Sequence, residues 1–564
     1  MENKEISRAL KLLSQLMELH QENSFKIKSI TNASFKVDKL PFKLKDKTKE
    51  ELEKIDGIGK SIASKITELL QTNTIQDIED LISNTPAGVV EMLSIKGLGP
   101  KKIEVIWNFL GIENLGELYY ACNENRLIEA KGFGLKTQEE IKKAIEFKMA
   151  NAGRFLYAKI EKLAESYLQE FTQTLQKIDP DLKIVLTGAF RRKCEIIEEL
   201  EYLFISDDAS ILSKNLFETE QFQIIYQDET HLHLKDLNGI NIKLWSATSA
   251  EAGLKLFETT GCATHVEKVK AYLKPNQIFT SEGEIYAAAK MDFIAPELRE
   301  DGNEIEKALK YEIKELIKFE DLKGTLHNHS TWSDGVHKIE EMAIYCRDTL
   351  ALSYLGMCDH SKTAVYANGL SIERVLQQQE EIDYLNKKLA PFKIFKGIES
   401  DILGDGSLDY PDEILKKFDF VVASVHSNLK MDEEKATQRL IRAIENPYTT
   451  ILGHPTGRLL LSRSGYPLDF KKIIDACAAN HVVIEINANP LRLDLDWRWH
   501  QYALEQGVLL SINPDAHRNE GFLDMQYGIN VARKGGLYPQ KCLNSFSLPQ
   551  INTFFEERKS TIKI

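Results

Sequence analysis

Short apolar runs alternate with helical segments over the last part of the chain, from about residue 321 onward. Seven runs of strand length occupy residues 322–329, 354–360, 392–400, 418–426, 449–454, 482–487 and 508–517. The segments between them, such as SIERVLQQQEEIDYLNKKLA, carry apolar residues at helical spacing. Strands that alternate with helices in this way form parallel sheets covered by helices. The pattern predicts an α/β domain, most economically a distorted seven-stranded β/α barrel.

The first 150 residues have a different pattern, in which a repeated glycine turn separates helices. The element x-x-G-(apolar)-G-x occurs at residues 55–60, 95–100 and 130–135, each time at the start of a helical segment. Residues 154–181 are also helical in pattern, and 183–187 form a short strand that leads into Gly188. We expect a helical first part and an α+β middle part. With 564 residues, the chain has room for about three to five domains.

Composition favours a soluble, multidomain protein, with 43% hydrophobic and 28% charged residues. No apolar run approaches the ~18 residues of a membrane span, and the N-terminus lacks an apolar signal core. We therefore expect a cytoplasmic protein that does not contact membranes. The seven cysteines are scattered without a CxxC pair, which favours reduced thiols. Because the net charge is −13, any nucleic acid would have to bind through local basic patches, backbone amides or bound cations.

The repeated glycine turns suggest such local binding. A tight turn of this kind needs glycine for a positive φ, and it directs the free amides of the next helix outward, where they can hold a phosphate. A single turn of this type is equally well read as a plain helix connection, whereas three copies imply one repeated role. The candidate DNA-binding glycines are Gly57, Gly59, Gly97, Gly99, Gly132 and Gly134. The lysines beside them are Lys60, Lys101, Lys102, Lys131 and Lys136.

Polar residues in the predicted barrel gather where the strands end. The set comprises His327, His329, Asp334, His360, Glu399, His426, His454, Asp515 and His517. The carboxyl ends of barrel strands meet on one face, where catalytic groups collect. Six histidines and three carboxylates at that face predict a metal centre. Nine ligands exceed the about four that one zinc ion takes, so we expect a centre with several cations.

The order of these motifs resembles the family X DNA polymerases, and in particular the bacterial PolX proteins, which add a PHP phosphoesterase domain. The likeness covers residues 1 to about 560: glycine hairpins, the turn at Gly188, a carboxylate strand, the T-G-x-x-x-H motif at 260–265 and the Pro-Glu-Leu-Arg segment at 296–299. It implies helix-hairpin-helix elements that grip the DNA backbone without reading sequence. It also implies a polymerase-like palm and thumb ahead of the barrel.

The polymerase-like motifs depart from the family pattern at the positions that bind the catalytic metals and the nucleotide. The family's aspartate pair matches Glu199 and Glu201, and its third aspartate matches Asn241. The serine of its glycine-serine turn is Ala189, and the aromatic pair before Thr-Gly is Glu258-Thr259. Two-metal nucleotidyl transfer needs three well-placed carboxylates, so the Mg²⁺ site is weakened and we expect little or no polymerase activity. The retained Gly188, Arg191 and Arg192 are expected to keep a grip on DNA phosphate.

In the PHP domain, by contrast, no ligand of the family pattern is replaced. The resemblance implies three divalent cations, Mn²⁺ or Zn²⁺. One is held by His327, His329, Glu399 and Asp515, a second by Glu399, His426 and His454, and a third by Asp334, His360 and His517. Arg458 and Arg492 are candidate clamps for the substrate phosphate, although surface ion pairs would explain them nearly as well. Lys65 matches the family's Schiff-base lysine, which would give lyase activity, and a solvated helix lysine is the alternative reading.

The expected organisation has five parts. Residues 1–90 form an N-terminal, lyase-like helical DNA-binding domain with the first hairpin, and 91–150 a fingers-like region with the second and third. Residues 151–250 form the palm, 251–320 the thumb and linker, and 321–564 the PHP domain.

The function expected from these parts is metal-dependent 3′-5′ DNA exonuclease activity in DNA repair. Two cations would activate the hydroxide that attacks phosphorus in line. The DNA would be primer-template, gapped or free 3′ ends, bound without sequence preference and near the nucleoid. One alternative is a gap-filling polymerase that is edited by the hydrolase. Another is a small-molecule phosphatase with a DNA-binding adaptor.

Overall fold

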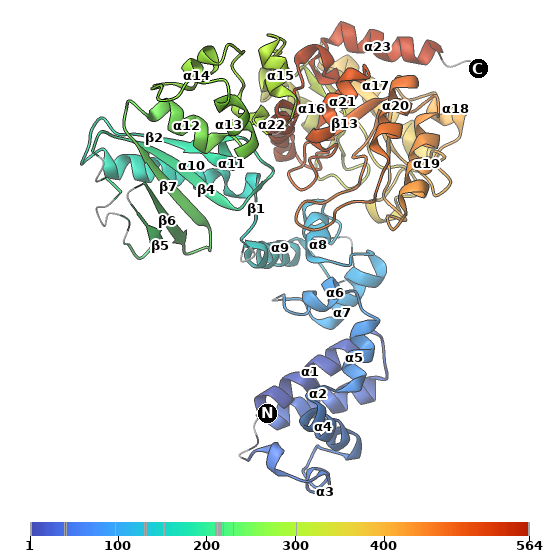
Figure 1. Cartoon of the computed structure of the whole chain (residues 1–564). Helices are drawn as coiled ribbons and strands as arrows, with labels where there is room; N and C mark the ends of the chain where they lie inside the picture. The colour runs from blue at the N-terminus through green and yellow to red at the C-terminus, as the bar shows by residue number, and fades with distance from the viewer. Residues whose placement is uncertain are drawn as a thin grey trace. The chain divides into compact units, whose positions relative to one another are not determined.

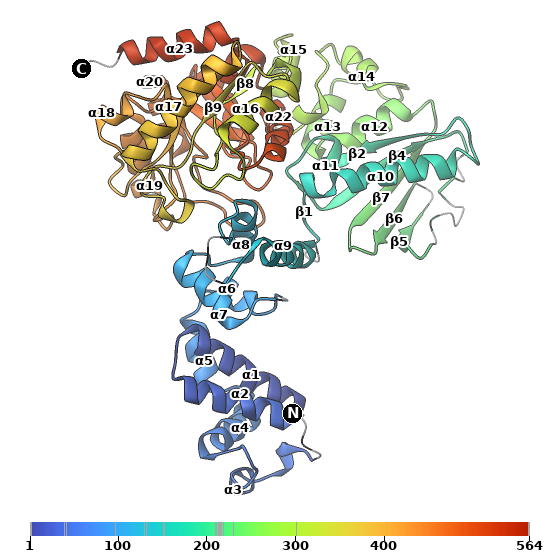
Figure 2. The ribbon, with the colours of Figure 1, turned by 180° about the vertical axis from the view of Figure 1, so that it is seen from behind.

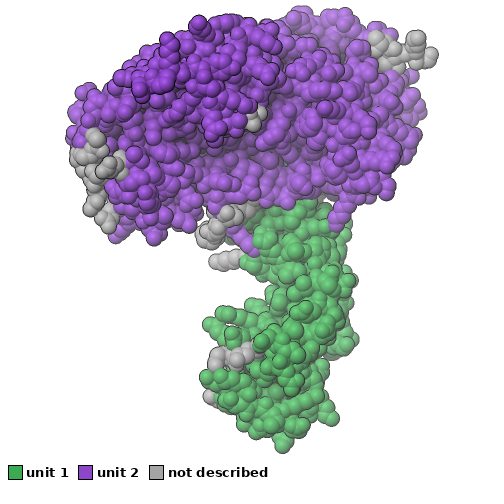
Figure 3. Space-filling model, in the orientation of Figure 1, with its two compact units in different colours: residues 1–147 green, residues 148–564 purple. Residues whose placement is uncertain are grey.

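The computed structural model describes residues 3–561 except 39, 41, 96, 129, 131, 151–152, 209–210, 213–216, 218, 229 and 301. The chain divides into two compact units, residues 1–147 and 148–564, which Figure 3 shows in different colours. Among the described residues, no helix is both long and apolar enough to cross a membrane.

Unit 1 is helical, as the glycine-turn pattern predicts. Its α-helices are α1 (Asn3–Leu19), α2 (Ser24–Asp38), α3 (Lys49–Leu52), α4 (Lys60–Thr72), α5 (Gln76–Ser83), α6 (Ala87–Met92), α7 (Pro100–Glu104), α8 (Leu115–Asn123) and α9 (Leu135–Ala150) (Figure 1). Gly57, Gly97 and Gly132 have φ values of 81°, 90° and 92°, a region that other residues rarely adopt. The three turns therefore require glycine, and α4, α7 and α9 begin just after them.

The first half of unit 2 is built on a five-stranded sheet in the order β2-β4-β7-β6-β5. The strands are β2 (Lys183–Thr187), β4 (Glu199–Ile205), β5 (Phe222–Gln227), β6 (His231–Asp236) and β7 (Asn241–Ala247). A separate pair joins β1 (Phe155–Leu156) to β3 (Ile196–Ile197). The accompanying helices are α10 (Tyr157–Leu175), α11 (Gly188–Arg191), α12 (Ala252–Thr260), α13 (Ala263–Lys270), α14 (Glu282–Ala288) and α15 (Glu304–Leu309). One face of the sheet packs on α10, seen across the strands in Figure 2, through a shared core.

The second half of unit 2 is the predicted β/α structure. Its seven parallel strands lie in chain order: β8 (Gly324–Thr325), β9 (Tyr354–Met357), β10 (Lys393–Asp401), β11 (Phe420–Ser424), β12 (Ile451–Leu452), β13 (Val483–Asn487) and β14 (Leu510–Asn513). The helices are α16 (Ile339–Asp348), α17 (Ile372–Leu389), α18 (Asp412–Leu415), α19 (Glu433–Ile444), α20 (Phe470–Ala479), α21 (His500–Glu505), α22 (Met525–Lys534) and α23 (Leu548–Thr561). All seven predicted strands are confirmed.

The barrel closes just beyond its first and last strands. Asn328 and Ala516 form a parallel bridge, and the backbone N–H of His329 donates to the Ala516 carbonyl at 2.9 Å. Side chains alternate across each strand, as the pleat requires. In β11, Val422 joins one buried cluster with Phe555 of α23, whereas its neighbours belong to the larger cluster that includes the surrounding helices. Closure brings the carboxyl ends of the strands around one centre.

Buried ion pairs join the two halves of unit 2. Lys534 of α22 has a side chain only 1% exposed, and its Nζ lies 2.6 Å from Glu300 Oε1. The same ammonium group donates to the carbonyl of Arg192 at 3.1 Å. Nearby, Arg533 Nε lies 2.8 Å from Glu297 Oε1. The barrel is thus tied directly to the turn after α11 and to the Pro-Glu-Leu-Arg segment.

Candidate metal centre and polymerase-like site

The nine predicted ligands converge at the carboxyl ends of the barrel strands, and Glu399 of β10 lies in the middle of them. One of its oxygens, Oε1, is 3.3 Å from His327 Nε2 and 3.1 Å from His426 Nε2. The same oxygen is 3.0 Å from His454 Nε2, and Oε2 is 2.9 Å from His360 Nδ1. Because only 1% of this side chain is exposed, its carboxylate interacts mainly with these imidazole rings and little with solvent.

The ligand atoms fall into three overlapping groups, in each of which they all lie within 4.8 Å of one another. The groups are His329, Asp334, His360 and His517; His327, His329 and Asp515; and His360, Glu399 and His426. His454 joins through its contact with Glu399. The sequence reasoning thus assembled residues that the fold brings together from six different strands and the loops that follow them.

Several buried atoms of this centre have no hydrogen-bond partner within the described part of the chain. They are Nε2 of His327, both ring nitrogens of His329, Oδ2 of Asp334, both ring nitrogens of His360, Oε2 of Glu399 and Nδ1 of His454. A buried polar atom left without a partner costs about 1–3 kcal/mol. Imidazole nitrogens and carboxylate oxygens are the donors that Mn²⁺ and Zn²⁺ bind. The donor set therefore fits divalent cations.

The pKa shifts of two predicted ligands, Glu399 and His329, run in the direction that cation binding needs, whereas the neighbouring carboxylates outweigh burial and raise the pKa of His327, His360 and His426. Burial alone would raise the pKa of the Glu399 carboxyl, but the neighbouring histidines, His426 and His327 foremost, hold that pKa well below its usual range. Burial lowers the pKa of His329 to about 4, and His517 acts in the same direction. An ionised carboxylate and a neutral imidazole are both competent ligands.

Two carboxylates that the sequence reasoning missed orient the ligand rings. Glu485 of β13 accepts from His327 Nδ1 at 2.7 Å, and Asp401 of β10 accepts from His426 Nδ1 at 2.5 Å. Each bond fixes which ring nitrogen faces the centre, as acidic partners of metal-bound histidines do. A signal was present for Asp401, because it lies two residues after Glu399 on one strand, and alternate strand residues share a face.

Replacing Asp401 by Asn should weaken metal binding by about tenfold, since a partner of a ligating histidine typically contributes at least that much to affinity. We expect slower hydrolysis at limiting Mn²⁺ and recovery at saturating Mn²⁺, measured by titration. Asp405, whose side chain is 59% exposed, supplies the matched control Asp405→Asn. A Mn²⁺ dependence that is the same in all three proteins would exclude the orienting role.

Two of the predicted ligands have backbone conformations that non-glycine residues rarely adopt. The φ of His454 is 21° and that of Asp515 is 54°. Such conformations cost of the order of 1–3 kcal/mol each and gather at functional sites. Here they turn the two side chains out of the strand direction and toward the centre.

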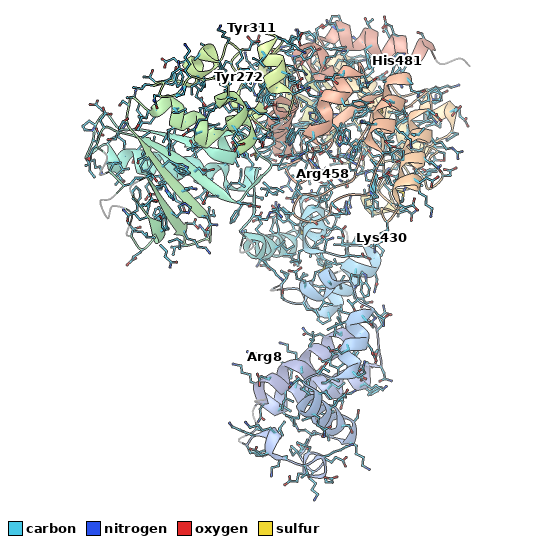
Figure 4. The ribbon with its side chains drawn as sticks, viewed as in Figure 1. Arg8, Tyr272, Tyr311, Lys430, Arg458 and His481 are labelled. Atoms are coloured by element: carbon cyan, nitrogen blue, oxygen red, sulfur yellow. The ribbon has the colours of Figure 1, made fainter. Side chains whose placement is uncertain are left out.

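The two candidate phosphate clamps differ in their surroundings. Arg492 is buried, and its Nε lies 3.9 Å from the predicted ligand Asp515. Arg458, labelled in Figure 4, lies 2.5 Å from Asp496 through Nη1. It also donates to the carbonyls of Arg492, at 2.8 Å, and of Leu493. Arg458 therefore holds the loop that carries Arg492, and a phosphate-clamping role for either residue stays a prediction.

The three polymerase-like positions meet on the five-stranded sheet. Glu199 and Glu201 lie on one face of β4, and β7 runs parallel beside it, with Glu199 opposite Asn241 and Glu201 opposite Lys243. Glu201 Oε2 accepts from the indole N–H of Trp245 at 3.0 Å. Burial raises the pKa of both glutamates. The strands that carry a polymerase-like site are present, but Lys243 lies beside its two glutamates.

The side chain of Glu201, which is longer than the aspartate of the family pattern, fills the turn at Gly188. Gly188 has a φ of 64°, and a Cβ added there would collide with the carboxylate of Glu201. In the family pattern this turn faces the incoming triphosphate, beside Ala189. In this chain the side chain of Glu201 occupies the space beside the Gly188 backbone.

The arginine pair after this turn is engaged within the protein. Arg191 forms a bidentate pair with Glu282, at 2.9 and 2.6 Å, while Arg192 pairs with Glu300 at 3.0 Å. Arg192 also donates to the carbonyl of Thr260 at 2.7 Å. Both residues thus fasten the turn to later parts of the chain, and binding of phosphate by their guanidinium groups stays a prediction.

The glycine turns of unit 1 have the geometry that amide binding needs. Gly59 and Gly99 are extended residues immediately before α4 and α7, and no side chain caps either helix. Lys60, Lys101, Lys102 and Lys136 lie at or near the helix starts, while Lys131 lies outside the described residues. Lys65 of α4 is ion-paired with Asp77. A paired ammonium is not the free amine that Schiff-base formation needs, and lyase activity stays a prediction.

Two family models and several known proteins match parts of this chain. A helix-hairpin-helix domain model matches residues 1–75, and a SAM-like helix-hairpin-helix tandem model matches residues 89–146. A probable phosphatase of Thermoanaerobacter sp. (strain X514) is 30% identical over 188 residues, 32% of this chain and 74% of its own length. A probable phosphatase of Caldicellulosiruptor bescii is 35% identical over 142 residues, 23% of this chain and 55% of that protein.

One relative matches along nearly the whole chain. The protein named DNA polymerase/3′-5′ exonuclease PolX of Bacillus subtilis (strain 168) is 34% identical over 581 aligned positions, which cover 99% of this chain and 100% of that protein. The glycine hairpins, the palm-like sheet and the seven-stranded barrel all lie within the aligned region. The chain therefore belongs to the PolX family.

Proposed function

We propose that this chain is a metal-dependent 3′-5′ DNA exonuclease of DNA repair whose hydrolytic site is the barrel centre around Glu399. The observation that carries the proposal is the convergence of nine buried or half-buried histidines and carboxylates at one end of the barrel. Its support comes from the full-length relative, whose name includes this activity. Action on DNA would place the protein in the cytoplasm, at the nucleoid.

The centre would hold three divalent cations, Mn²⁺ or Zn²⁺. One would be bound by His327, His329, Glu399 and Asp515, a second by Glu399, His426 and His454, and a third by Asp334, His360 and His517. The close groups support this division, although Glu399 also lies beside His360. Such cations, when bound, lower the pKa of water and stabilise the charge that develops on a phosphate.

The protein's own residues would prepare and orient this reaction. Asp401 and Glu485 would keep the ring nitrogens of His426 and His327 directed at the centre. Arg492, beside Asp515, would bind a phosphate oxygen, because a guanidinium group matches that geometry. Arg458 would keep the loop of Arg492 in place.

DNA would be held by unit 1 through the amides after the glycine turns and through the neighbouring lysines. The ends bound would be those of primer-templates, gaps or free 3′ strands, without sequence preference. The polymerase-like module would contribute little synthesis, because Asn241 brings no charge and Lys243 lies among the acids.

A small-molecule phosphatase is the second candidate, since the relatives that match only the barrel are named probable phosphatases. Those proteins are aligned over at most 32% of this chain. The helical unit and the palm-like sheet lie outside such a match, which favours DNA as the substrate.

Labelled primer-template with Mn²⁺ tests the proposal in wild type and His327→Ala. We expect wild type to shorten the primer from its 3′ end, and His327→Ala to lose this activity by a factor of about a thousand, because a metal ligand is removed. His337 is half-buried outside the nine ligands, so His337→Ala is the control. Turnover of a small phosphate ester with no shortening of any DNA would support the phosphatase instead.

A further inference from the structure

Strand β13 is the barrel strand whose end carries none of the nine predicted ligands (Figure 1). It lies between β12 and β14, which are followed by His454 and Asp515. Val483 of β13 belongs to the buried cluster that includes Phe555. Because side chains alternate along a strand, Glu485 and Asn487 point to the same side as Val483. This strand therefore brings polar side chains to the centre without bringing a predicted ligand.

The side-chain amide of Asn487 lies between two buried carboxylates. Its Nδ2 donates to Glu485 Oε1 at 2.9 Å and to Asp515 Oδ2 at 3.1 Å. Asn487 is fully buried, and the side chains of Glu485 and Asp515 are 0% and 4% exposed. Hydrogen bonds to ionised acceptors are stronger than those between neutral groups. The amide thus ties the two acids together and offsets the repulsion between their charges.

The oxygen of the same amide fixes its orientation. Oδ1 accepts from the backbone N–H of Asn489 at 3.1 Å. If the amide were turned over, its oxygen would face two acids and its NH₂ group would face another N–H, and none of these contacts would be a hydrogen bond. The backbone N–H of Asn487 also donates to the carbonyl of Asp494 at 2.6 Å. The loop after β13 therefore holds the amide, and the amide holds the acids.

Both acids act directly on predicted ligand atoms. Glu485 Oε2 is 2.7 Å from His327 Nδ1, so the other ring nitrogen faces the centre. Asp515 is itself a predicted ligand, and Asn487 engages its Oδ2. The second oxygen, Oδ1, lies 2.9 Å from His329 Nε2 and 3.6 Å from His327 Nε2. One buried amide thus determines which atoms of two neighbouring ligands are directed into the centre.

We propose that Asn487 is a positioning residue of the metal centre. It keeps one oxygen of Asp515 directed at the centre and keeps Glu485 against His327, and it touches neither cation nor substrate. Hydrogen-bond partners of metal ligands typically contribute about ten- to a hundredfold to metal affinity. The inference rests on the proposed function, because it takes the barrel centre as the metal site.

A purely structural role is the competing explanation, because Asn487 also bonds to the loop that follows it. The two roles differ in how Mn²⁺ changes stability. A structural residue stabilises the barrel equally with and without metal. Loss of a positioning residue reduces the stabilisation that Mn²⁺ adds, since that increment depends on the affinity of the folded protein for the metal. Melting temperatures in chelator and in Mn²⁺ therefore separate the two roles.

Asn487→Ala in the full chain tests the proposal, by titration of metal-free protein with Mn²⁺ and detection of free Mn²⁺ by electron paramagnetic resonance. We expect the dissociation constant of at least one bound Mn²⁺ to rise about tenfold. The rise in melting temperature on adding Mn²⁺ should be smaller than in wild type. Circular dichroism in chelator checks that the variant folds.

Asn544→Ala is the matched control, since this amide is equally buried inside the same barrel. Its Nδ2 donates to the carbonyl of Gly324 at 3.2 Å, and its Oδ1 accepts from the backbone N–H of Ile512 at 2.7 Å. The change should lower the melting temperature alike in chelator and in Mn²⁺. Mn²⁺ affinity should stay at the wild-type value.

Asn487→Ser is a milder variant that decides the matter if Asn487→Ala does not fold. A hydroxyl donates one hydrogen bond where the amide donates two, so we expect about threefold weaker Mn²⁺ binding, half the free energy of a tenfold change. Wild-type affinity in the Asn487 variants that fold, or an equal loss in Asn544→Ala, would overturn the proposal. Wild type without any Mn²⁺ binding would overturn the metal centre as well. Tight Mn²⁺ binding without shortening of DNA would contradict the exonuclease alone, and the comparison of variants would still decide the role of Asn487.

Discussion

Glu399→Gln should lower phosphodiester hydrolysis by about a thousandfold, equivalent to about 4 kcal/mol of transition-state stabilisation. The reason is position: the carboxylate of Glu399 is the group within 3.3 Å of His327, His360, His426 and His454. An amide keeps the shape but removes the charge that would hold neighbouring cations together. Metal content per chain, measured by mass spectrometry after desalting, should fall in the same variant.

Glu556→Gln, on an exposed residue of α23, is the control for loss of a negative charge. It should keep wild-type metal content and rate. Circular dichroism should be alike in all three proteins, because the barrel core does not depend on Glu399. If Glu399→Gln retained its metals and stayed within tenfold of the wild-type rate, the centre would have to be arranged around another residue.

The second large effect that we expect is a gain of nucleotide incorporation. Replacing Glu199, Glu201 and Asn241 together by Asp should raise nucleotide incorporation by about a hundredfold, a change of the size that a 1 Å displacement of a catalytic group produces. Shorter arms would withdraw from the Gly188 turn that Glu201 now fills, and the third charge would return. Primer extension with Mg²⁺ measures the gain, in a His327→Ala background so that shortening does not hide it.

Glu198→Asp serves as the control, because this neighbouring side chain is 69% exposed and lies outside the three matched positions. It should leave extension at the low wild-type level. Ala189 and Glu258-Thr259 remain unrestored in the triple variant, so the gain should not reach the rate of an efficient polymerase. Strong extension by the unaltered palm that Glu201→Ala abolishes would instead show an active polymerase site.

The barrel and its ligands could be predicted because both follow local rules. Parallel strands are buried on both faces, so 418–426 and 482–487 stand out as apolar runs, and their ends must meet once the sheet closes. His426 was therefore predictable from its place after a run. Its orienting partner Asp401 was missed, since the choice between metal ligand and hydrogen-bond partner depends on side-chain direction and not on spacing.

The contacts of the arginine pair, in contrast, could not be predicted from the sequence. Arg191 and Arg192 match the family turn in sequence, and their contacts are with Glu282 and Glu300, about a hundred residues further on. Ion pairs over such separations leave no periodic pattern. The histidines of β6 and the tryptophan of β7 give no such pattern either, because they become neighbours only through strand register.

The buried pair of Lys534 and Glu300 bears on how a DNA end could pass between the palm and the barrel. Separating the two halves would remove Lys534, whose side chain is 1% exposed, from the carboxylate of Glu300. Breaking a buried ion pair of this kind costs about 3–5 kcal/mol. Within unit 2, palm and barrel should consequently behave as one rigid body. A DNA end released by the polymerase-like site would have to reach the barrel centre by movement of the DNA itself. The rate of this transfer would then depend on fraying of the DNA strands and not on a hinge motion of the protein.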